Sequence, residues 1–349
     1  MTDNYGYVYT IAKLDTAAQL GLLTKKGAEV LEKLRIAYAD AEGHDGELSP
    51  LGGRQHQEIA RRMYTRFPQL LSQPIEVDAE SSPSGRCVKS MSYFCGELKD
   101  LNPELHIHTV VNTSHISYII GNFDLEIEPG PDMPALEKKT NDMEKTLTNS
   151  RLLKSLFTDV SKAKEFIKPI ELIGSLFEIA SDLTNLPELG LSLMDVFTKE
   201  ELFGFWKYAN AAILVDGGFI PGSSPTYLYQ VEARDSIVAL ADRVISDGKP
   251  ALTLCFSHDG TILPLCYLMG FKEAMGGHKN LKTVHKSISI DKLIPMAANI
   301  QLVFYRKEGS DDILLKFLLN ENETSLPIPT DIPPYYHWTD VKSCWENWR

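Results

Sequence analysis

Apolar and polar residues follow two different periods along the chain, and the first third predicts helices alternating with short strands. Over residues 22–38, apolar side chains recur three and four positions apart, which is typical of one face of a helix. A second helix is predicted to begin at Pro50 with Ser49 as its N-cap, because a proline at the first helical position lacks only an N–H that would have no partner. The next predicted elements are a strand at 75–79, a helix at 86–98 and a strand at 106–111. This alternation favours α/β layers around a parallel sheet.

Residues 115–234 have a different pattern, because helical periods dominate there. Helices are predicted over 152–166, 170–183 and 199–214. We interpret this part as a helical insertion. The later elements are a helix at 235–245, an apolar run at 251–256 expected to form a central buried strand, a helix at 261–269, and a hairpin of strands 300–305 and 313–319. The sequence therefore predicts a discontinuous α/β core over 1–114 and 235–349 and a helical cap domain over 115–234.

Composition and charge exclude several classes of partner. The 349 residues are 43% hydrophobic, and 47 acidic against 35 basic residues give a net charge of -12. This balance argues against a broad contact with nucleic acid, and no apolar run is long enough for a membrane span. The first five residues have neither the basic nor the apolar region of an export signal, so we expect none in the chain as written. The oligomeric state and the compartment stay open.

The five cysteines do not indicate a metal site. They stand at positions 87, 95, 255, 266 and 344, and no two are separated by two residues as in a zinc ribbon or a redox motif. Their apolar surroundings predict buried free thiols.

The pair His258-Asp259 is the first candidate for chemistry. It follows the predicted strand 251–256 and precedes a helix, and open α/β folds bind ligands at this edge of a parallel sheet. A helix N-terminus attracts anions, and an imidazole beside a carboxylate can transfer a proton. However, His44-Asp45 occurs in a glycine-rich surface loop, so the dipeptide alone carries no information. The residues leave two interpretations open, an anion site or a buried polar turn.

Arg86 is the second candidate. It lies in the first turn of the helix predicted after strand 75–79, where the positive end of the helix dipole disfavours a cation unless an anion is near. The alternative is a simple pairing with a carboxylate such as Glu80.

Three segments carry a resemblance to a known family. Residues 46–56, Gly-Glu-Leu-Ser-Pro-Leu-Gly-Gly-Arg-Gln-His, resemble the L-T-P-L-G-x-R-Q-H segment of the histidine acid phosphatases, and most of all the branch of multiple inositol polyphosphate phosphatases and phytases. Residues 81–90 are similar to the family's R-S-T-x-x-x-R-x-x-x-S segment, with Arg86 on its phosphate-binding arginine and Ser90 on its closing serine. Ser257-His258-Asp259 matches the His-Asp motif, and residues 294–306 are also similar.

The resemblance implies a fold and an activity. The fold is a parallel-sheet core sandwiched by helices, with a helical cap. The activity is hydrolysis of phosphomonoesters, with inositol polyphosphates such as phytate as substrates, through a phosphohistidine and without metal or cofactor. Arg86 and His258 then hold the phosphoryl group, and Asp259 is the general acid. The implied partner is a small phosphorylated substrate, and relatives are exported to a periplasm, the cell exterior or a secretory lumen.

The sequence also departs from the family. The motif R-H-G-x-R-x-P supplies the nucleophilic histidine and two arginines, and no Arg-His-Gly occurs in the 349 residues. The resemblance places that motif just before Met1, and Glu80 stands where relatives carry an arginine. We therefore expect the chain alone to be inactive. Three hypotheses follow: a phosphatase whose first strand precedes Met1, a homologue that binds phosphorylated ligands without hydrolysing them, or an unrelated α/β protein.

Overall fold

The computed structural model describes residues 4–113, 117–147 and 150–347, and its contacts divide the chain into two compact units. The first unit comprises residues 1–54 and 138–209, and the second comprises 55–137 and 210–349. Three helices continue from one unit into the other: α3 (Pro50–Arg66), α7 (Met133–Lys145) and α11 (Lys199–Asp216). These unit boundaries differ from the predicted boundaries between core and cap, which lie at 114–115 and 234–235. The boundary at 114–115 lies outside the described residues. That division stays a prediction.

The first unit is helical. Its own helices are α1 (Asn4–Gln19), α2 (Lys25–Ala41), α8 (Ser150–Leu156), α9 (Val160–Ala163) and α10 (Pro169–Asp182). Leu34, Leu156 and Leu172 are fully buried in one apolar core that these helices share. The Thr24 hydroxyl caps α2 by accepting a hydrogen bond from the Gly27 N–H at 2.9 Å, which satisfies a donor in the first turn.

The single helix predicted over 152–166 is wrong, because the chain leaves the helix between α8 and α9. Phe157 forms an antiparallel bridge with Leu23, and the Thr158 N–H donates to the Leu22 carbonyl at 2.8 Å. Asp159 then starts α9 by accepting a hydrogen bond from the Lys162 N–H at 3.0 Å. A long-range backbone pairing therefore interrupts an apolar pattern that reads as one continuous helix.

The second unit is built from two sheets and their helices. The strands are β1 (Glu76–Ser81), β2 (His106–Val111), β3 (Ala251–Phe256), β4 (Ile300–Arg306), β5 (Ile313–Leu319), β6 (Asn322–Glu323) and β7 (Tyr336–His337). The helices are α4 (Pro68–Leu71), α5 (Gly85–Leu101), α6 (Ser117–Ile120), α12 (Val231–Asp247), α13 (Asp259–Leu268), α14 (Ile290–Leu293) and α15 (Trp338–Asn347). β1 pairs in parallel with both β2 and β3, and β4 pairs antiparallel with β5. The predicted α/β class with a parallel sheet and the predicted hairpin are therefore confirmed.

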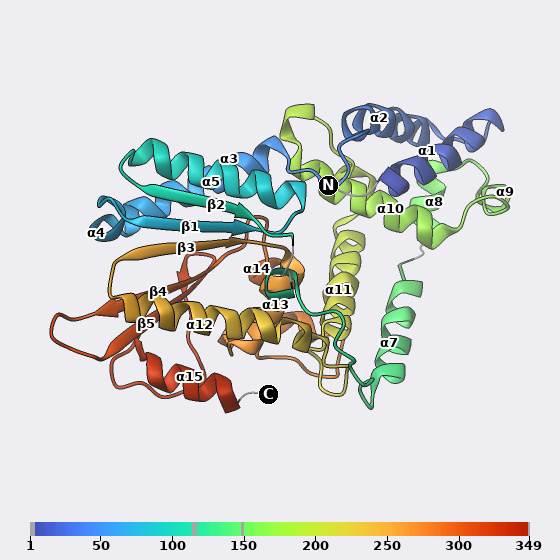
Figure 1. The fold of residues 1–349 in the computed structure, drawn as a ribbon. Helices are drawn as coiled ribbons and strands as arrows, with labels where there is room; N and C mark the ends of the chain where they lie inside the picture. The colour runs from blue at the N-terminus through green and yellow to red at the C-terminus, as the bar shows by residue number, and fades with distance from the viewer. Residues whose placement is uncertain (1–3, 114–116, 148–149, 348–349) are drawn as a thin grey trace. The chain divides into compact units, whose positions relative to one another are not determined.

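The central strand of the parallel sheet is β1. Its odd residues Val77, Ala79 and Ser81 are buried, and its even residues point to the other face. Val77 packs in a core with residues of α3 and α5, and these two helices run along one side of the strands in Figure 1. This alternation follows from the two-residue repeat of a strand.

Within the described residues, the strand at 251–256 is neither central nor fully buried, contrary to the prediction from the sequence. β3 forms an edge of the sheet, whose strand order is β2-β1-β3. Leu252, Leu254 and Phe256 pack on the core below α3 and α5, but Thr253 and Cys255 are exposed. Among the described residues, no strand pairs with the outer edge of β3 or with the edge of β4 opposite β5.

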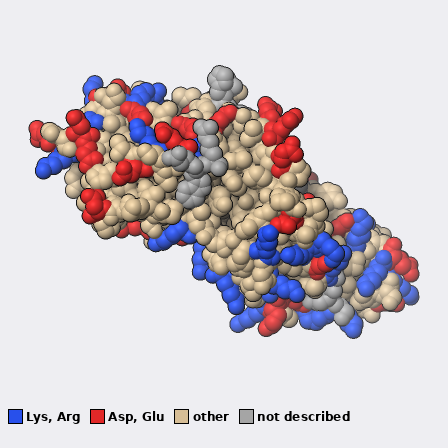
Figure 2. Space-filling view, turned by 90° about the horizontal axis from the view of Figure 1, so that it is seen from below, with Lys and Arg blue, Asp and Glu red and all other residues tan. Residues whose placement is uncertain are grey.

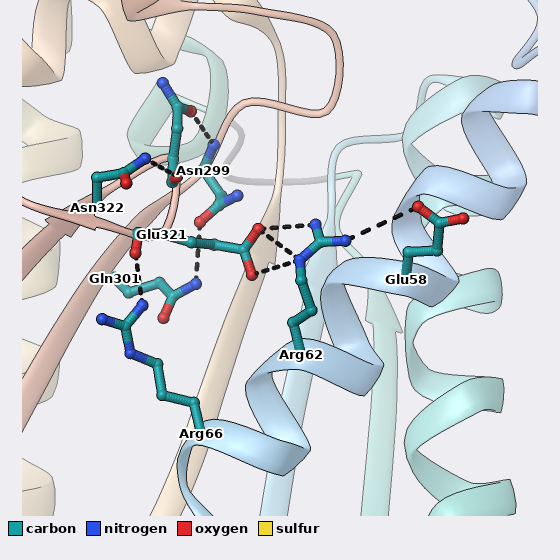
Figure 3. A network of polar contacts seen from close by, with 8 residues as sticks. Glu58, Arg62, Arg66, Asn299, Gln301, Glu321 and Asn322 are labelled. Atoms are coloured by element: carbon teal, nitrogen blue, oxygen red, sulfur yellow. Dashed lines mark hydrogen bonds and ion pairs between the residues drawn. The ribbon is translucent and has the colours of Figure 1, made fainter.

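A polar network joins α3 to the antiparallel sheet (Figure 3). Asn320 and Glu321 form the two-residue turn between β5 and β6, and both have positive φ angles, the left-handed geometry of tight hairpins. The Arg62 guanidinium donates to Glu321 Oε2 at 2.7 Å and to Oε1 at 3.1 Å, and Arg66 donates to the Glu321 carbonyl at 2.5 Å. The Asn299 N–H donates to Asn320 Oδ1 at 3.1 Å. Side chains therefore link the layers of the second unit without a backbone ladder between β3 and β4.

The face of the molecule drawn in Figure 2 carries charges of both signs. On the face drawn in Figure 2, lysine and arginine side chains lie among aspartate and glutamate side chains, with wide uncharged areas between them. No helix among the described residues is both long and apolar enough to cross a membrane.

The ion pair between Arg62 and Glu321 is expected to stabilise the second unit. Arg62→Gln and Glu321→Gln should each lower the free energy of unfolding by about 1 kcal/mol, since the Glu321 side chain is only 22% exposed and loses a bidentate partner. The double substitution should cost less than the sum of the two, as urea denaturation of the four proteins would show. Additive effects would contradict a direct contribution of the pair.

Candidate active site

The carboxyl ends of β1 and β3 bring two of the predicted site residues into contact. Arg86 Nη2 lies 2.9 Å from His258 Nδ1, although 172 residues separate them in the chain. Arg86 is exposed in the first turn of α5, and His258 is half-buried directly before α13. Parallel pairing causes this meeting, because both strands end at the same edge of the sheet.

Two helix N-termini meet at the Arg86–His258 pair. Neither N-cap residue, Ser84 of α5 or His258 of α13, caps its helix with a side-chain hydrogen bond. Cys87 and Thr261 already donate to the N-cap carbonyls, so the N–H groups that no N-cap side chain occupies, and that can face an anion, are those of the first two residues of each helix. Ser257, the residue after β3, ties the end of this strand to α6, because its hydroxyl donates to the Ile119 carbonyl at 2.5 Å.

The contact with Arg86 decides the tautomer of His258. A guanidinium only donates hydrogen bonds, so His258 Nδ1 accepts and the ring proton of the neutral imidazole is on Nε2. Nε2 lies 3.1 Å from the hydroxyl of Ser82, to which it donates. Ser82 is 1% exposed and was not among the site residues predicted from the sequence. Its position could have indicated a role, because Ser82 lies at the end of the strand, directly before the turn that leads to Arg86.

Burial and charge keep His258 neutral near pH 7. Burial lowers the pKa of the His258 imidazole, the Arg86 charge lowers it further, and the Asp259 charge raises it. The neutral ring has a lone pair at Nδ1 for Arg86, and protonation would replace that hydrogen bond by repulsion.

The other predicted residues have different surroundings. Asp259 is the exposed first residue of α13, close enough to act on the pKa of His258. Ser90 donates to the Arg86 carbonyl at 2.9 Å, so its hydroxyl serves the backbone of α5. Glu80 accepts from Asn112 Nδ2 at 2.7 Å and from the Tyr118 hydroxyl at 2.5 Å. The simple pairing of Arg86 with Glu80 is therefore not formed.

The nearby thiols are not poised as nucleophiles. Cys87 is buried, its Sγ lies 3.8 Å from His258 Nε2, and burial raises the pKa of this thiol. Cys255 was expected to be buried but keeps contact with solvent; the protein around it still raises the pKa of its thiol to about 12. Both sulfurs therefore stay protonated at neutral pH. No group of three His, Cys, Asp or Glu in the described part of the chain is arranged to hold a metal ion.

A second histidine lies near the end of β3. The ring of His56, in α3, meets the ring of Phe256 edge to face with centroids 6.1 Å apart. Burial lowers the pKa of the His56 imidazole, so this ring is also neutral near pH 7.

The electrostatics of His258 can be tested by NMR titration. Arg86→Gln should raise the pKa of His258 because a positive charge is removed, and Asp259→Asn should lower it because a negative charge is removed. The ¹⁵N shifts of the wild-type ring should show the proton on Nε2 at pH 7.5. A ring protonated on Nδ1, or pKa changes of the same sign in both variants, would contradict this arrangement of Arg86, His258 and Asp259.

Comparisons with known proteins identify the fold. No family model matches the chain. Multiple inositol polyphosphate phosphatase 1 of Gallus gallus is 22% identical over 329 residues, covering 83% of this chain and 68% of that protein. The structure of a Bifidobacterium longum multiple inositol polyphosphate phosphatase in complex with inositol hexasulfate matches with a TM-score of 0.76 and 18% identity, covering 97% of this chain and 87% of the other. A phytase from D. castellii matches with a TM-score of 0.74 and 14% identity, covering 97% of this chain and 74% of the other. The chain is thus a homologue of the multiple inositol polyphosphate phosphatases and has the fold of the histidine acid phosphatases.

Proposed function

We propose that this protein binds a phosphomonoester at the Arg86–His258 pair and takes part in the hydrolysis of inositol phosphates. The observation that carries the proposal is the 2.9 Å contact of Arg86 with His258 at two uncapped helix N-termini. The similarity to inositol polyphosphate phosphatases and to a phytase supports the substrate class, and two of the Bifidobacterium longum structures hold inositol hexasulfate or phosphate.

In the proposed reaction, the residues of this chain hold the phosphoryl group and move a proton. Arg86 turns from His258 to a phosphate oxygen, and His258 takes up a proton on the vacated Nδ1 and donates it in a hydrogen bond to a second oxygen. Asp259 protonates the leaving alkoxide as the phosphoryl group passes to a nucleophilic histidine. The same carboxylate then removes a proton from the water that cleaves the phosphohistidine.

The origin of the nucleophilic histidine is a separate part of the proposal. The 349 residues contain no Arg-His-Gly, and the edges of β3 and β4 have no strand partner among the described residues. We propose that a strand with the family's Arg-His-Gly motif pairs with the edge of β3, where its last residues would meet His258. Without this strand the chain is a phosphate-binding homologue that does not hydrolyse its ligand, and the lack of the motif favours this second function for the 349 residues alone.

Anion binding tests the proposal directly. Inorganic phosphate, followed by calorimetry, should bind the wild type, and Arg86→Gln or His258→Gln should weaken binding at least ~10-fold because each removes a charge-assisted hydrogen bond. Arg54→Gln is the matched control, since it also removes an exposed arginine, one that pairs with Glu188 at 2.5 Å. Sulfate keeps its charge over the pH range, so its affinity should rise as the pH falls and His258 becomes protonated. Equal binding by the wild type and Arg86→Gln would refute the site.

Activity assays separate the two functions. The 349-residue chain should have negligible activity on an aryl phosphate near pH 5, because the covalent step has no nucleophile. A fusion that adds a strand with Arg-His-Gly-x-Arg-x-Pro before Met1 should be active. Asp259→Asn in this fusion should slow alkyl phosphates far more than aryl phosphates, since only poor leaving groups need the proton. Activity of the unfused chain that is lost in His56→Ala would instead show that His56 acts as the nucleophile.

A further inference from the structure

Glu80 places a negative charge near the carboxyl end of β1, two residues before Ser82. It is the fifth residue of β1, in register with Val110 of β2 and Cys255 of β3. The donors from Asn112 and Tyr118 both bind its Oε1. Its Oε2 has no hydrogen-bond donor among the described residues. The carboxylate is therefore held in a defined direction through Oε1, and none of the described donors occupies Oε2.

The position of Glu80 relative to His258 follows from the strand repeat. Ser82 continues the ladder of β1, because its N–H donates to the Phe256 carbonyl at 3.0 Å. The hydroxyl of Ser82 lies 3.1 Å from His258 Nε2. Residues two apart in a strand point to the same face at a spacing of about 7 Å. Glu80 is thus one strand repeat away from the hydroxyl that holds the imidazole.

The electrostatic surroundings of Cys255 support this proximity. Although Cys255 keeps contact with solvent, desolvation by the surrounding protein raises the pKa of its thiol most, followed by the charge of Glu80 and then by Cys87. The Sγ of Cys87 lies 3.8 Å from His258 Nε2. Cys255 is therefore influenced both by the charge of Glu80 and by Cys87, whose sulfur lies next to His258.

A carboxylate at this place affects monophosphates and polyphosphates differently. A single phosphate on Arg86 and His258 is compensated by the arginine and two helix N-termini. Each further phosphate on the same ligand that lies on the Glu80 side adds a repulsion between like charges, whereas a hydroxyl there can donate to Oε2.

We propose that Glu80 determines substrate specificity, selecting phosphomonoesters that carry hydroxyl groups rather than phosphates next to the scissile group, which among inositol phosphates means the less phosphorylated members. This inference rests on the proposed binding of phosphate at Arg86 and His258.

The test compares three ligands and four proteins by calorimetry, the proteins being the wild type, Glu80→Gln, Glu76→Gln and Arg86→Gln. The ligands are inorganic phosphate, myo-inositol 1-phosphate and inositol hexasulfate, which cannot be hydrolysed at phosphorus. Glu80→Gln should raise the affinity for the hexasulfate on the order of tenfold at 0.15 M salt and change the affinity for the monophosphate less than about twofold. Glu76→Gln is the matched control, because it removes the same charge from the same face of β1 at its other end, where Glu76 binds His108 at 2.9 Å. This control should change neither affinity by more than about twofold.

The outcomes distinguish this inference from the proposed function. Phosphate binding that depends on Arg86, with an unchanged ratio of hexasulfate to monophosphate affinity in Glu80→Gln, would overturn the role of Glu80 and leave the phosphate site intact. Phosphate binding that does not depend on Arg86 would overturn the proposed function itself. The wild type alone also decides the question if Glu80→Gln fails to fold, because a hexasulfate affinity ~100-fold above that of the monophosphate would contradict selection against further anionic groups.

Discussion

The parallel pairing of β1 with β3 is the constraint on which the candidate site depends. Its register joins Ser81 to Phe256, so each strand ends beside the other and the chain turns into a helix at the same edge. Arg86 and His258 then meet across 172 residues because each lies within a few residues of its strand end. In an antiparallel pair the two turns would lie at opposite edges, and the same residues would share no ligand.

Much of this arrangement follows from local sequence patterns. The strands β2, β3 and β5 have the bounds that their apolar runs predict, and Ser49 and Pro50 predict the start of α3. The meeting of Arg86 with His258 follows from the strand-turn-helix pattern at both places together with a parallel sheet. The period of apolar residues predicts the type and bounds of an element because it indicates which side of the element is buried.

Other features depend on partners that are distant in sequence, and local patterns cannot predict them. The edge position of β3 depends on which strands flank it, which its own apolar run does not record. The break between α8 and α9 requires Leu23 as a bridge partner. The contact of Ser82 with His258 and the ion pair of Arg62 with Glu321 join residues 176 and 259 positions apart. Serine at the end of a strand is common, and only the fold shows which imidazole it holds.

The hydrogen bond between Arg86 and His258 also has a consequence for proton balance. While this hydrogen bond is formed, the Nδ1 lone pair accepts from Arg86 and cannot bind a second proton. An anion that draws Arg86 away leaves this nitrogen open beside Asp259, whose charge favours the imidazolium. Capture of an anion and uptake of a proton then become linked equilibria, so each strengthens the other. The proton therefore acts as a second ligand of the site, because it competes with Arg86 for the lone pair of His258 Nδ1.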